Sequence, residues 1–151
     1  MDEDSDAAGV IVVGVDGSDG SLEALRWAAA QAEATGDTLE VLMAWEWPNA
    51  WGRTPAWPPG QDPADQTTRL LAEAVDRALG PRHSPPVHQV VVEGHPASAL
   101  IAASEHAALL VVGSRGLGGF AGLMLGSVTQ HCTTHAACPV VVVRHRPTQS
   151  D

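Results

Sequence analysis

The segment that decides the fold of this 151-residue chain is Gly113-Ser114-Arg115-Gly116-Leu117-Gly118-Gly119, which is followed by Gly126-Ser127. A short apolar run, residues 107–112, precedes this segment and is typical of a buried strand. A helical pattern begins after Gly126. We therefore predict a unit made of a strand, a glycine-rich loop and a helix.

Such a loop is suited to holding a phosphate group. Glycines let a ligand come close to backbone N–H groups, and the first turn of a helix adds unpaired N–H groups and a partial positive charge. Ser127 either caps the helix or donates its hydroxyl to the phosphate. The alternative is a connecting loop whose glycines only make turns.

The charge of the chain favours an anion site at this place and argues against polyanionic partners. The net charge is −10, there is no lysine, and residues 106–150 contain no aspartate or glutamate. Because an acidic surface repels nucleic acid and anionic membranes, we expect neither as a partner. A bound nucleotide would be held locally, by backbone N–H groups and by Arg115.

The length of the chain fits one domain with short segments outside it. The composition predicts a disordered acidic tail over residues 1–8, the domain over residues 9–146 and a flexible C-terminus over residues 147–151. No apolar run approaches the roughly 20 residues that cross a membrane, and the N-terminus lacks a signal-peptide pattern. A cytoplasmic location is therefore the expectation.

Strand-like apolar runs alternate with helical patterns along the chain. The expected strands are residues 10–15, 38–45, 87–92, 108–112 and 139–144, and the expected helices are residues 22–35, 63–79, 96–106 and 127–136. This alternation predicts an α/β fold, a single-domain five-stranded parallel sheet with helices on both faces. Ligands of such sheets bind at the carboxyl ends of the strands, where the winding direction reverses. The turn at residues 16–18 and the glycine loop would share one crevice if the first and fourth strands were neighbours.

Two common nucleotide-binding motifs do not fit the sequence. A P-loop needs a lysine after its last glycine, and this chain has none. Residues 116–121 approach the dinucleotide fingerprint, but no carboxylate follows about 20 positions later to bind the ribose. The glycine loop therefore belongs to a different class of nucleotide site.

The spacing that fits is Gly113-x2-Gly116-x9-Gly126-Ser127, together with Val13-Gly14-Val15-Asp16-Gly17-Ser18 and the closing Cys138-Pro139-Val140-Val141-Val142-Val143. With these motifs the chain resembles the universal stress protein family, in particular its ATP-binding branch, from residue 9 to residue 146. The resemblance implies a Rossmann-like sheet of the adenine nucleotide alpha-hydrolase type. It also implies a regulatory module of the stress response that acts through nucleotide occupancy and dimerisation.

The resemblance assigns binding residues for ATP. Asp16 matches the aspartate that contacts the nucleoside in the family. Gly14 matches a position where the backbone passes close to the nucleotide, and Trp45 matches the position beside the adenine. The positions that wrap the ribose and the phosphates, mostly through backbone groups, are Gly113, Gly116, Gly119, Gly126, Ser127 and Val128. Arg115 is variable in the family, so its role rests on charge alone. Whether Mg²⁺ accompanies the ATP, and whether AMP or a cyclic nucleotide is preferred, stay open.

The resemblance further implies a homodimer. The last strand of the family often pairs with its copy across a two-fold axis. Residues 140–143 here are four valines, which form a short apolar strand suited to the edge of a sheet. We therefore expect an adenine nucleotide and a second copy of the chain as partners.

Two further groups of residues are each compatible with more than one role. One group lies in a proline-rich stretch and consists of Trp47, Trp51 and Trp57. Three roles fit this stretch: a surface loop packed back on the fold, a lid over the adenine, or a surface that binds a partner. A second group, His131, Cys132, His135 and Cys138, contains zinc-type ligands, but buried cysteines are commonly plain core residues. We predict no metal site.

Catalysis has little support in the sequence. Hydrolysis of ATP needs a metal-binding carboxylate and a positioned base, and near the loop the sequence offers only Asp16. We therefore predict a binding module without catalytic residues. One alternative is a slow ATPase or another nucleotide-dependent enzyme, and a second is an interaction scaffold that holds no nucleotide.

Overall fold

The computed structural model describes residues 9–47, 57–81, 86–114 and 125–145, in which strands and helices alternate strictly. The elements are β1 (Val10–Gly14), α1 (Asp19–Thr35), β2 (Thr38–Trp45), α2 (Pro63–Leu79), β3 (Val87–Glu93), α3 (Pro96–Ser104), β4 (Leu109–Gly113), α4 (Ser127–His135) and β5 (Val140–Val143). The order and type of all nine elements confirm the prediction from sequence periodicity.

The strands form one parallel sheet in the order β3-β2-β1-β4-β5. β1 lies in the middle, where Val10 pairs with Thr38 of β2 and Ile11 pairs with Leu109 of β4. The chain therefore winds outward from β1 to β3, returns to the centre at β4 and then winds outward in the other direction. The winding reverses between β1 and β4, which are the strands whose following loops looked specialised in the sequence.

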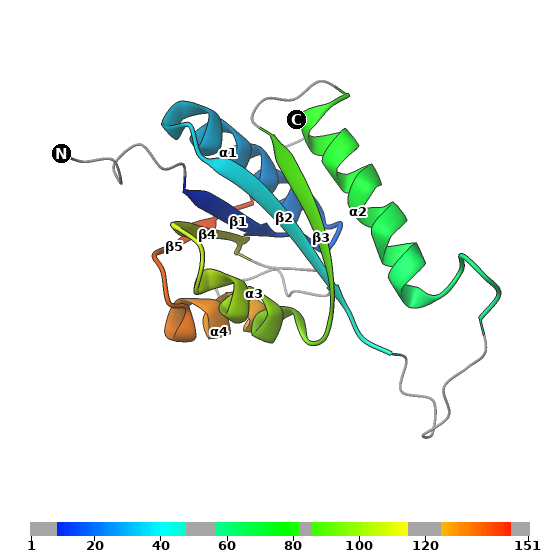
Figure 1. Cartoon of the computed structure of the whole chain (residues 1–151). Coiled ribbons are helices and arrows are strands. Elements are labelled where there is room, and N and C mark those ends of the chain that lie inside the picture. The colour runs from blue at the N-terminus through cyan, green and yellow to red at the C-terminus, as the bar shows by residue number, and fades with distance from the viewer. Residues whose placement is uncertain (1–8, 48–56, 82–85, 115–124, 146–151) are drawn as a thin grey trace, which may run out of the picture.

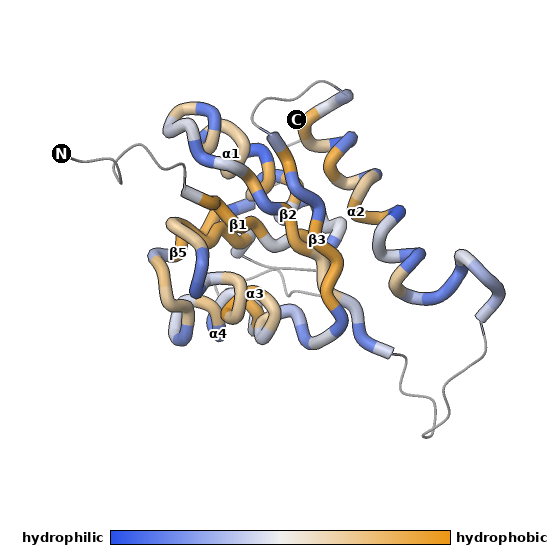
Figure 2. The backbone as a smooth tube through the Cα atoms, viewed as in Figure 1, coloured by the Kyte–Doolittle hydropathy of each residue, from blue (hydrophilic) through white to orange (hydrophobic). Residues whose placement is uncertain are grey.

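α1 and α2 cover one face of the sheet, and α3 and α4 cover the other (Figure 1). Because successive side chains of a strand point to opposite faces, Val13 and Val111 pack against α1 and α2, whereas Val12 and Val112 pack against α3 and α4. β1, β4 and β5 are accordingly apolar along their length, whereas β2 and β3 also carry hydrophilic residues. On the helices, the hydrophilic residues gather on the outer sides (Figure 2). This arrangement confirms the predicted single-domain α/β fold with helices on both faces.

The ends of three helices differ from the sequence prediction. α1 begins at Asp19 rather than residue 22, because Ser18 is the N-cap and its Oγ accepts a hydrogen bond from the Ser21 amide at 3.3 Å. α3 ends at Ser104 rather than residue 106. α4 begins at Ser127 as predicted and ends at His135 rather than residue 136; its N-cap is Gly126, so of the two roles considered for Ser127 that of cap is wrong.

Several expectations concern residues outside the described ranges. The predicted tails at residues 1–8 and 147–151, as well as Arg115, Gly116, Gly119 and Trp51, fall in this category. In the ranges that are described, no helix combines the length and apolar character that a membrane crossing requires.

Candidate functional site

The carboxyl ends of β1 and β4 meet the first turn of α1 at one edge of the sheet. A Cβ atom on Gly113, the last residue of β4, would lie 3.1 Å from the carbonyl oxygen of Gly20 in α1. Side chains do not normally come this close to a backbone oxygen, so glycine is what permits the contact. Gly113 therefore lets the start of α1 pack directly against the end of β4.

The turn after β1 is built around the Asp16 carboxylate. One oxygen of this carboxylate, Oδ1, accepts hydrogen bonds from the Ser18 amide at 2.9 Å and from the Ser18 hydroxyl at 2.5 Å. Gly17 has a φ of +86°, a conformation that favours glycine in tight turns. Asp16 thus lies exposed at the carboxyl end of β1 and at the same time orients the residue that caps α1.

The two ends of the glycine segment are joined by hydrogen bonds. The Gly126 amide donates to the Ser114 carbonyl at 2.8 Å, and the Thr129 hydroxyl donates to the Gly113 carbonyl at 2.6 Å. Thr129 is almost fully buried, so this second bond lies inside the fold. These bonds fix the first turn of α4 against the end of β4.

The N-terminus of α4 differs from those of the other helices. Ser18 caps α1, Asp62 caps α2 and His95 caps α3, each by accepting a backbone N–H through its side chain. The cap of α4 is Gly126, and no side-chain cap hydrogen bond is formed there. Because the first N–H groups of a helix have no partner within it, an anion that binds here could accept their hydrogen bonds.

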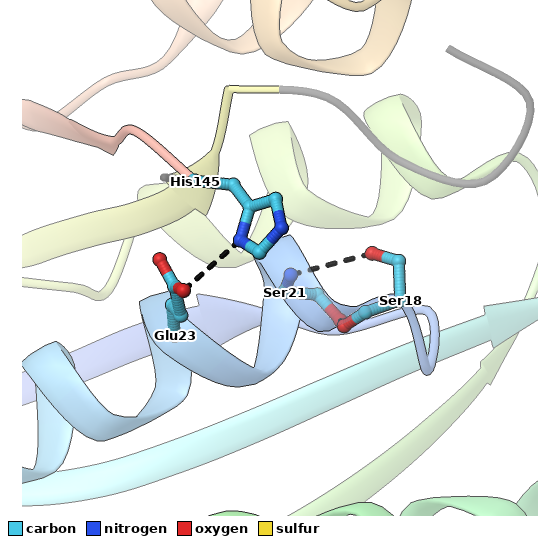
Figure 3. A network of polar contacts seen from close by, with 4 residues as sticks. All are labelled: Ser18, Ser21, Glu23 and His145. Carbon is cyan, nitrogen blue, oxygen red and sulfur yellow. Dashed lines mark hydrogen bonds and ion pairs between the residues drawn. The ribbon is translucent and has the colours of Figure 1, made fainter. Parts of the chain in front are cut away.

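A histidine–glutamate pair lies at the same edge of the sheet and was missed by sequence reasoning. Nδ1 of His145, two residues beyond β5, lies 3.0 Å from Oε1 of Glu23 in α1 (Figure 3). The two residues are 122 positions apart, so no local motif signals the pair. The period of two in β5 places Val141 and Val143 on the face that packs against α1, and His145 lies two residues beyond the end of this strand.

The residues expected near the nucleoside have structural roles of their own. A Cβ atom on Gly14 would lie 2.7 Å from Cδ1 of Leu100 in α3, so packing of α3 already favours glycine at this position. Trp45 ends β2, and its ring contacts the Trp47 ring edge-on, with the centroids 5.0 Å apart. Contact with a nucleotide is a separate role that remains a prediction for both residues.

Comparison with known proteins identifies the family. The sequence pattern of the universal stress protein family matches residues 8–144. The chain belongs to the universal stress protein family. Among its relatives, a universal stress protein of Thermus aquaticus is 34% identical over 137 residues, which cover 89% of this chain and 97% of that protein. One of Mycobacterium tuberculosis is 39% identical over 143 residues, or 89% of this chain, but these amount to only 44% of that protein. The chain thus spans a little under half the length of this longer relative.

Solved structures of universal stress proteins share the fold. UspA from Lactobacillus plantarum superposes with a TM-score of 0.71 at 22% identity, over 92% of this chain and 100% of that chain. A universal stress protein described as a complex with cAMP has a TM-score of 0.65 at 32% identity, over 91% of this chain and 97% of that chain. A universal stress protein from Archaeoglobus fulgidus, described as a complex with dAMP, has a TM-score of 0.65 at 20% identity, over 91% of this chain and 98% of that chain.

This universal stress protein gathers most of its predicted and described site residues at one edge of the sheet. Asp16 follows β1, Gly113 ends β4, and Gly126, Ser127 and Val128 begin α4 beside it. Trp45 ends β2, the other neighbour of β1. In the proline-rich stretch, Trp47 and Trp57 are exposed, and neither is part of the core.

The cysteines and histidines of the C-terminal third are spread over the surface and the core. Cys132 is completely buried, and this burial raises the pKa of its thiol to about 11. His131 is exposed, and its Nδ1 lies 2.8 Å from the Ser127 carbonyl oxygen, which can only accept a hydrogen bond. Within the described ranges, no three residues of the types that bind metals form a group that could hold an ion.

Proposed function

We propose that this universal stress protein binds an adenine nucleotide, with ATP as its ligand, at the carboxyl ends of β1 and β4. The observation that carries the proposal is the start of α4, which lacks a side-chain cap and is held against β4 where the winding of the sheet reverses. An anion bound there would accept hydrogen bonds from the first N–H groups of the helix.

The parts of the nucleotide would divide along this edge. Asp16 would bind the ribose hydroxyls or the adenine amine, with Gly14 beside the nucleoside, and Trp45 would contact the adenine. The phosphates would be bound by Gly113, Arg115, Gly116, Gly119, Gly126, Ser127 and Val128. Where Mg²⁺ accompanies ATP, phosphate oxygens and water would supply most of its ligands.

One relative supports an adenine nucleotide as the ligand class. The universal stress protein described as a complex with cAMP is 32% identical to this chain and covers nearly all of it. The carboxylate-free stretch at residues 106–150 adds to this support, because it leaves the start of α4 without a nearby acidic residue on its own segment.

We further propose that the protein works as a regulatory binding module and as a homodimer joined through β5. β5 is an outer strand of the sheet, and all four of its valines remain partly exposed in the single chain. An outer apolar strand leaves one row of backbone N–H and C=O groups available for a second copy. Occupancy by ATP would then be transmitted through the dimer and its partners.

The first experiment asks whether the protein carries and rebinds a nucleotide. Protein purified without added nucleotide is denatured, the released compounds are identified by mass, and ATP is titrated into emptied protein while tryptophan emission is followed. We expect Ser127→Ala to weaken ATP binding about five- to tenfold, with unchanged stability, because Ser127 is not the cap of α4. Thr133→Ala, on an exposed part of the same helix, is the matched control and should bind as the wild type does.

The same experiment distinguishes the alternatives. Absence of released nucleotide together with absence of any emission or thermal response to millimolar ATP would overturn the proposal and favour an interaction scaffold. Steady ADP production that Asp16→Ala abolishes would instead identify a slow ATPase.

A further inference from the structure

We propose that His131 and His135 of α4 form a binding site for one divalent metal ion that prefers imidazole ligands, of the class of Zn²⁺, Ni²⁺ and Cu²⁺. The inference goes beyond the proposed function, because neither residue is among those proposed to bind the nucleotide. It also departs from the prediction of no metal site, which considered the histidines together with two cysteines. The structure separates the exposed histidines from Cys132, which is completely buried.

The spacing of the two histidines places them side by side on the surface of α4. Residues four apart in an α-helix lie on the same face, one turn from each other. Two histidines with this spacing bind zinc on the helix that carries the H-E-x-x-H motif of metalloproteases. In α4 both histidines are exposed, their ring centroids are 6.4 Å apart, and the angle between the ring planes is 33°.

A hydrogen bond prepares His131 to act as a ligand. The Ser127 carbonyl oxygen lies 2.8 Å from Nδ1 of His131 and can only accept, so in the neutral ring Nδ1 carries the proton and Nε2 keeps its lone pair. Metal-binding histidines typically donate their other ring N–H in this way, which fixes the tautomer and the direction of the ring. Within the described ranges, Nε2 of His131 and both ring nitrogens of His135 have no hydrogen-bond partner.

A small rotation of the exposed side chains brings both rings to one ion. At Zn–N distances of about 2.0–2.1 Å, two imidazoles that bind the same tetrahedral ion have ring centroids roughly 5 Å apart. The observed separation of 6.4 Å is close to this value, and neither ring is held in place by the core. Among the described residues no third protein ligand joins the pair, so water would complete the coordination of the ion.

The surroundings favour a cation and give it an effect on α4. The net charge of −10 attracts positive ions to the protein. Apart from Gln130, α4 consists of serine, valine, threonine, histidine and cysteine, which all have modest helix propensity. Since the two rings meet only when the turn between them is helical, an ion bound by both would stabilise α4.

The test titrates Zn²⁺ into the untagged protein by calorimetry, without nucleotide and in a buffer that does not bind metals. We expect the wild type to bind one ion per chain. The affinity should be at least about tenfold lower in His131→Gln and in His135→Gln, since losing even an outer partner of a metal ligand costs that much. Zn²⁺ should also slow hydrogen exchange of the α4 amides in the wild type but not in these two variants.

Two control variants are matched to the site. His106→Gln removes an exposed histidine that contacts Glu40 at 3.3 Å, and it should bind Zn²⁺ as the wild type does. The double variant His135→Gln with Thr133→His keeps two histidines on α4 but spaces them two residues apart, so that they no longer face each other. It should bind as weakly as His135→Gln alone.

Two results would overturn the metal site. One is a wild type that binds no Zn²⁺, and the other is an affinity that stays unchanged in His131→Gln or in the double variant. Because no nucleotide takes part in the titration, either result leaves the proposed function standing.

Discussion

Cys132 shows how the environment of a single residue decides its chemistry. Its side chain is completely buried against α3 and β4, and burial raises the pKa of the thiol from 9.0 to about 11 because a thiolate would lose its hydration there. Cys138 is only partly buried, and its pKa is raised as well. At neutral pH Cys132 is therefore a small apolar core residue rather than a nucleophile or a metal ligand.

This environment predicts a difference in reactivity and a dependence on pH. Iodoacetamide at pH 8 should modify Cys138 and leave Cys132 intact in the folded protein, whereas both should react in urea, as measured by mass spectrometry.

Since the pKa of Cys132 is higher in the folded state, the free energy of unfolding is maintained below pH 9 and falls between pH 9 and 11, by about 1.4 kcal/mol per pH unit. The Cys132→Ala variant should lack this pH-dependent loss of stability. Equal reaction rates of the two cysteines with iodoacetamide in the folded protein would contradict the predicted difference in reactivity.

At the scale of elements, much could be predicted from the sequence because the signals are local. Apolar periodicity predicted all nine elements, and α1 and α2 end at the predicted residues 35 and 79, where Gly36 and Gly80 are the C-caps. The start of α1 was ambiguous because several neighbouring residues can act as caps, and hydrogen-bond geometry rather than residue type selects Ser18. Contacts between distant elements, such as that between His145 and Glu23, leave no local pattern.

Gly14 illustrates the same limit of prediction from local sequence, because the need for a glycine at this position comes from packing against another element. Its missing side chain lets Leu100 of α3 pack against β1. We expect Gly14→Ala to lower the free energy of unfolding by about 1–3 kcal/mol through overpacking, and Leu100→Ala by about 2–5 kcal/mol through the cavity it leaves. The double variant should be more stable than the sum of the two losses predicts, because the smaller residue 100 makes room for the new methyl group.

Chemical denaturation of the four proteins in this cycle provides the measurement. Strictly additive losses would show that Gly14 and Leu100 do not compete for the same space. In that case the glycine would be required for another reason, such as the approach of the nucleotide.

For the whole molecule, the order of the strands makes the site, and this order was not available from periodicity. An alternating sequence is compatible with several arrangements of a parallel sheet, and the pairing of β1 with β4 is what makes residue 16 and the glycine segment neighbours at the carboxyl edge. The sequence predicted a crevice shared by the two loops on the condition that the first and fourth strands are neighbours, and the strand order meets this condition. Arg115, Gly116 and Gly119 lie outside the described residues, so their contribution to the site stays a prediction.

The proposed dimer can be tested at the outer edge of the molecule because β5 uses alternate residues to pair with β4. The Pro139 and Val143 carbonyls accept from Leu110 and Ser114, at 3.0 and 2.9 Å, so by the period of two Val141 also faces β4. The backbone groups of Val140 and Val142 then face outward, toward the proposed second copy.

Proline substitutions separate these two sides of β5. Val142→Pro removes an outward N–H group and should convert the dimer to a folded monomer, since proline is tolerated where the N–H group of an outer strand faces solvent. Val141→Pro removes an N–H group that faces β4 and should lower the thermal midpoint markedly. Sedimentation equilibrium and thermal unfolding of both variants provide the measurement. A Val142→Pro variant that remains dimeric would place the interface elsewhere, because its outer strand would then be interrupted without consequence for assembly.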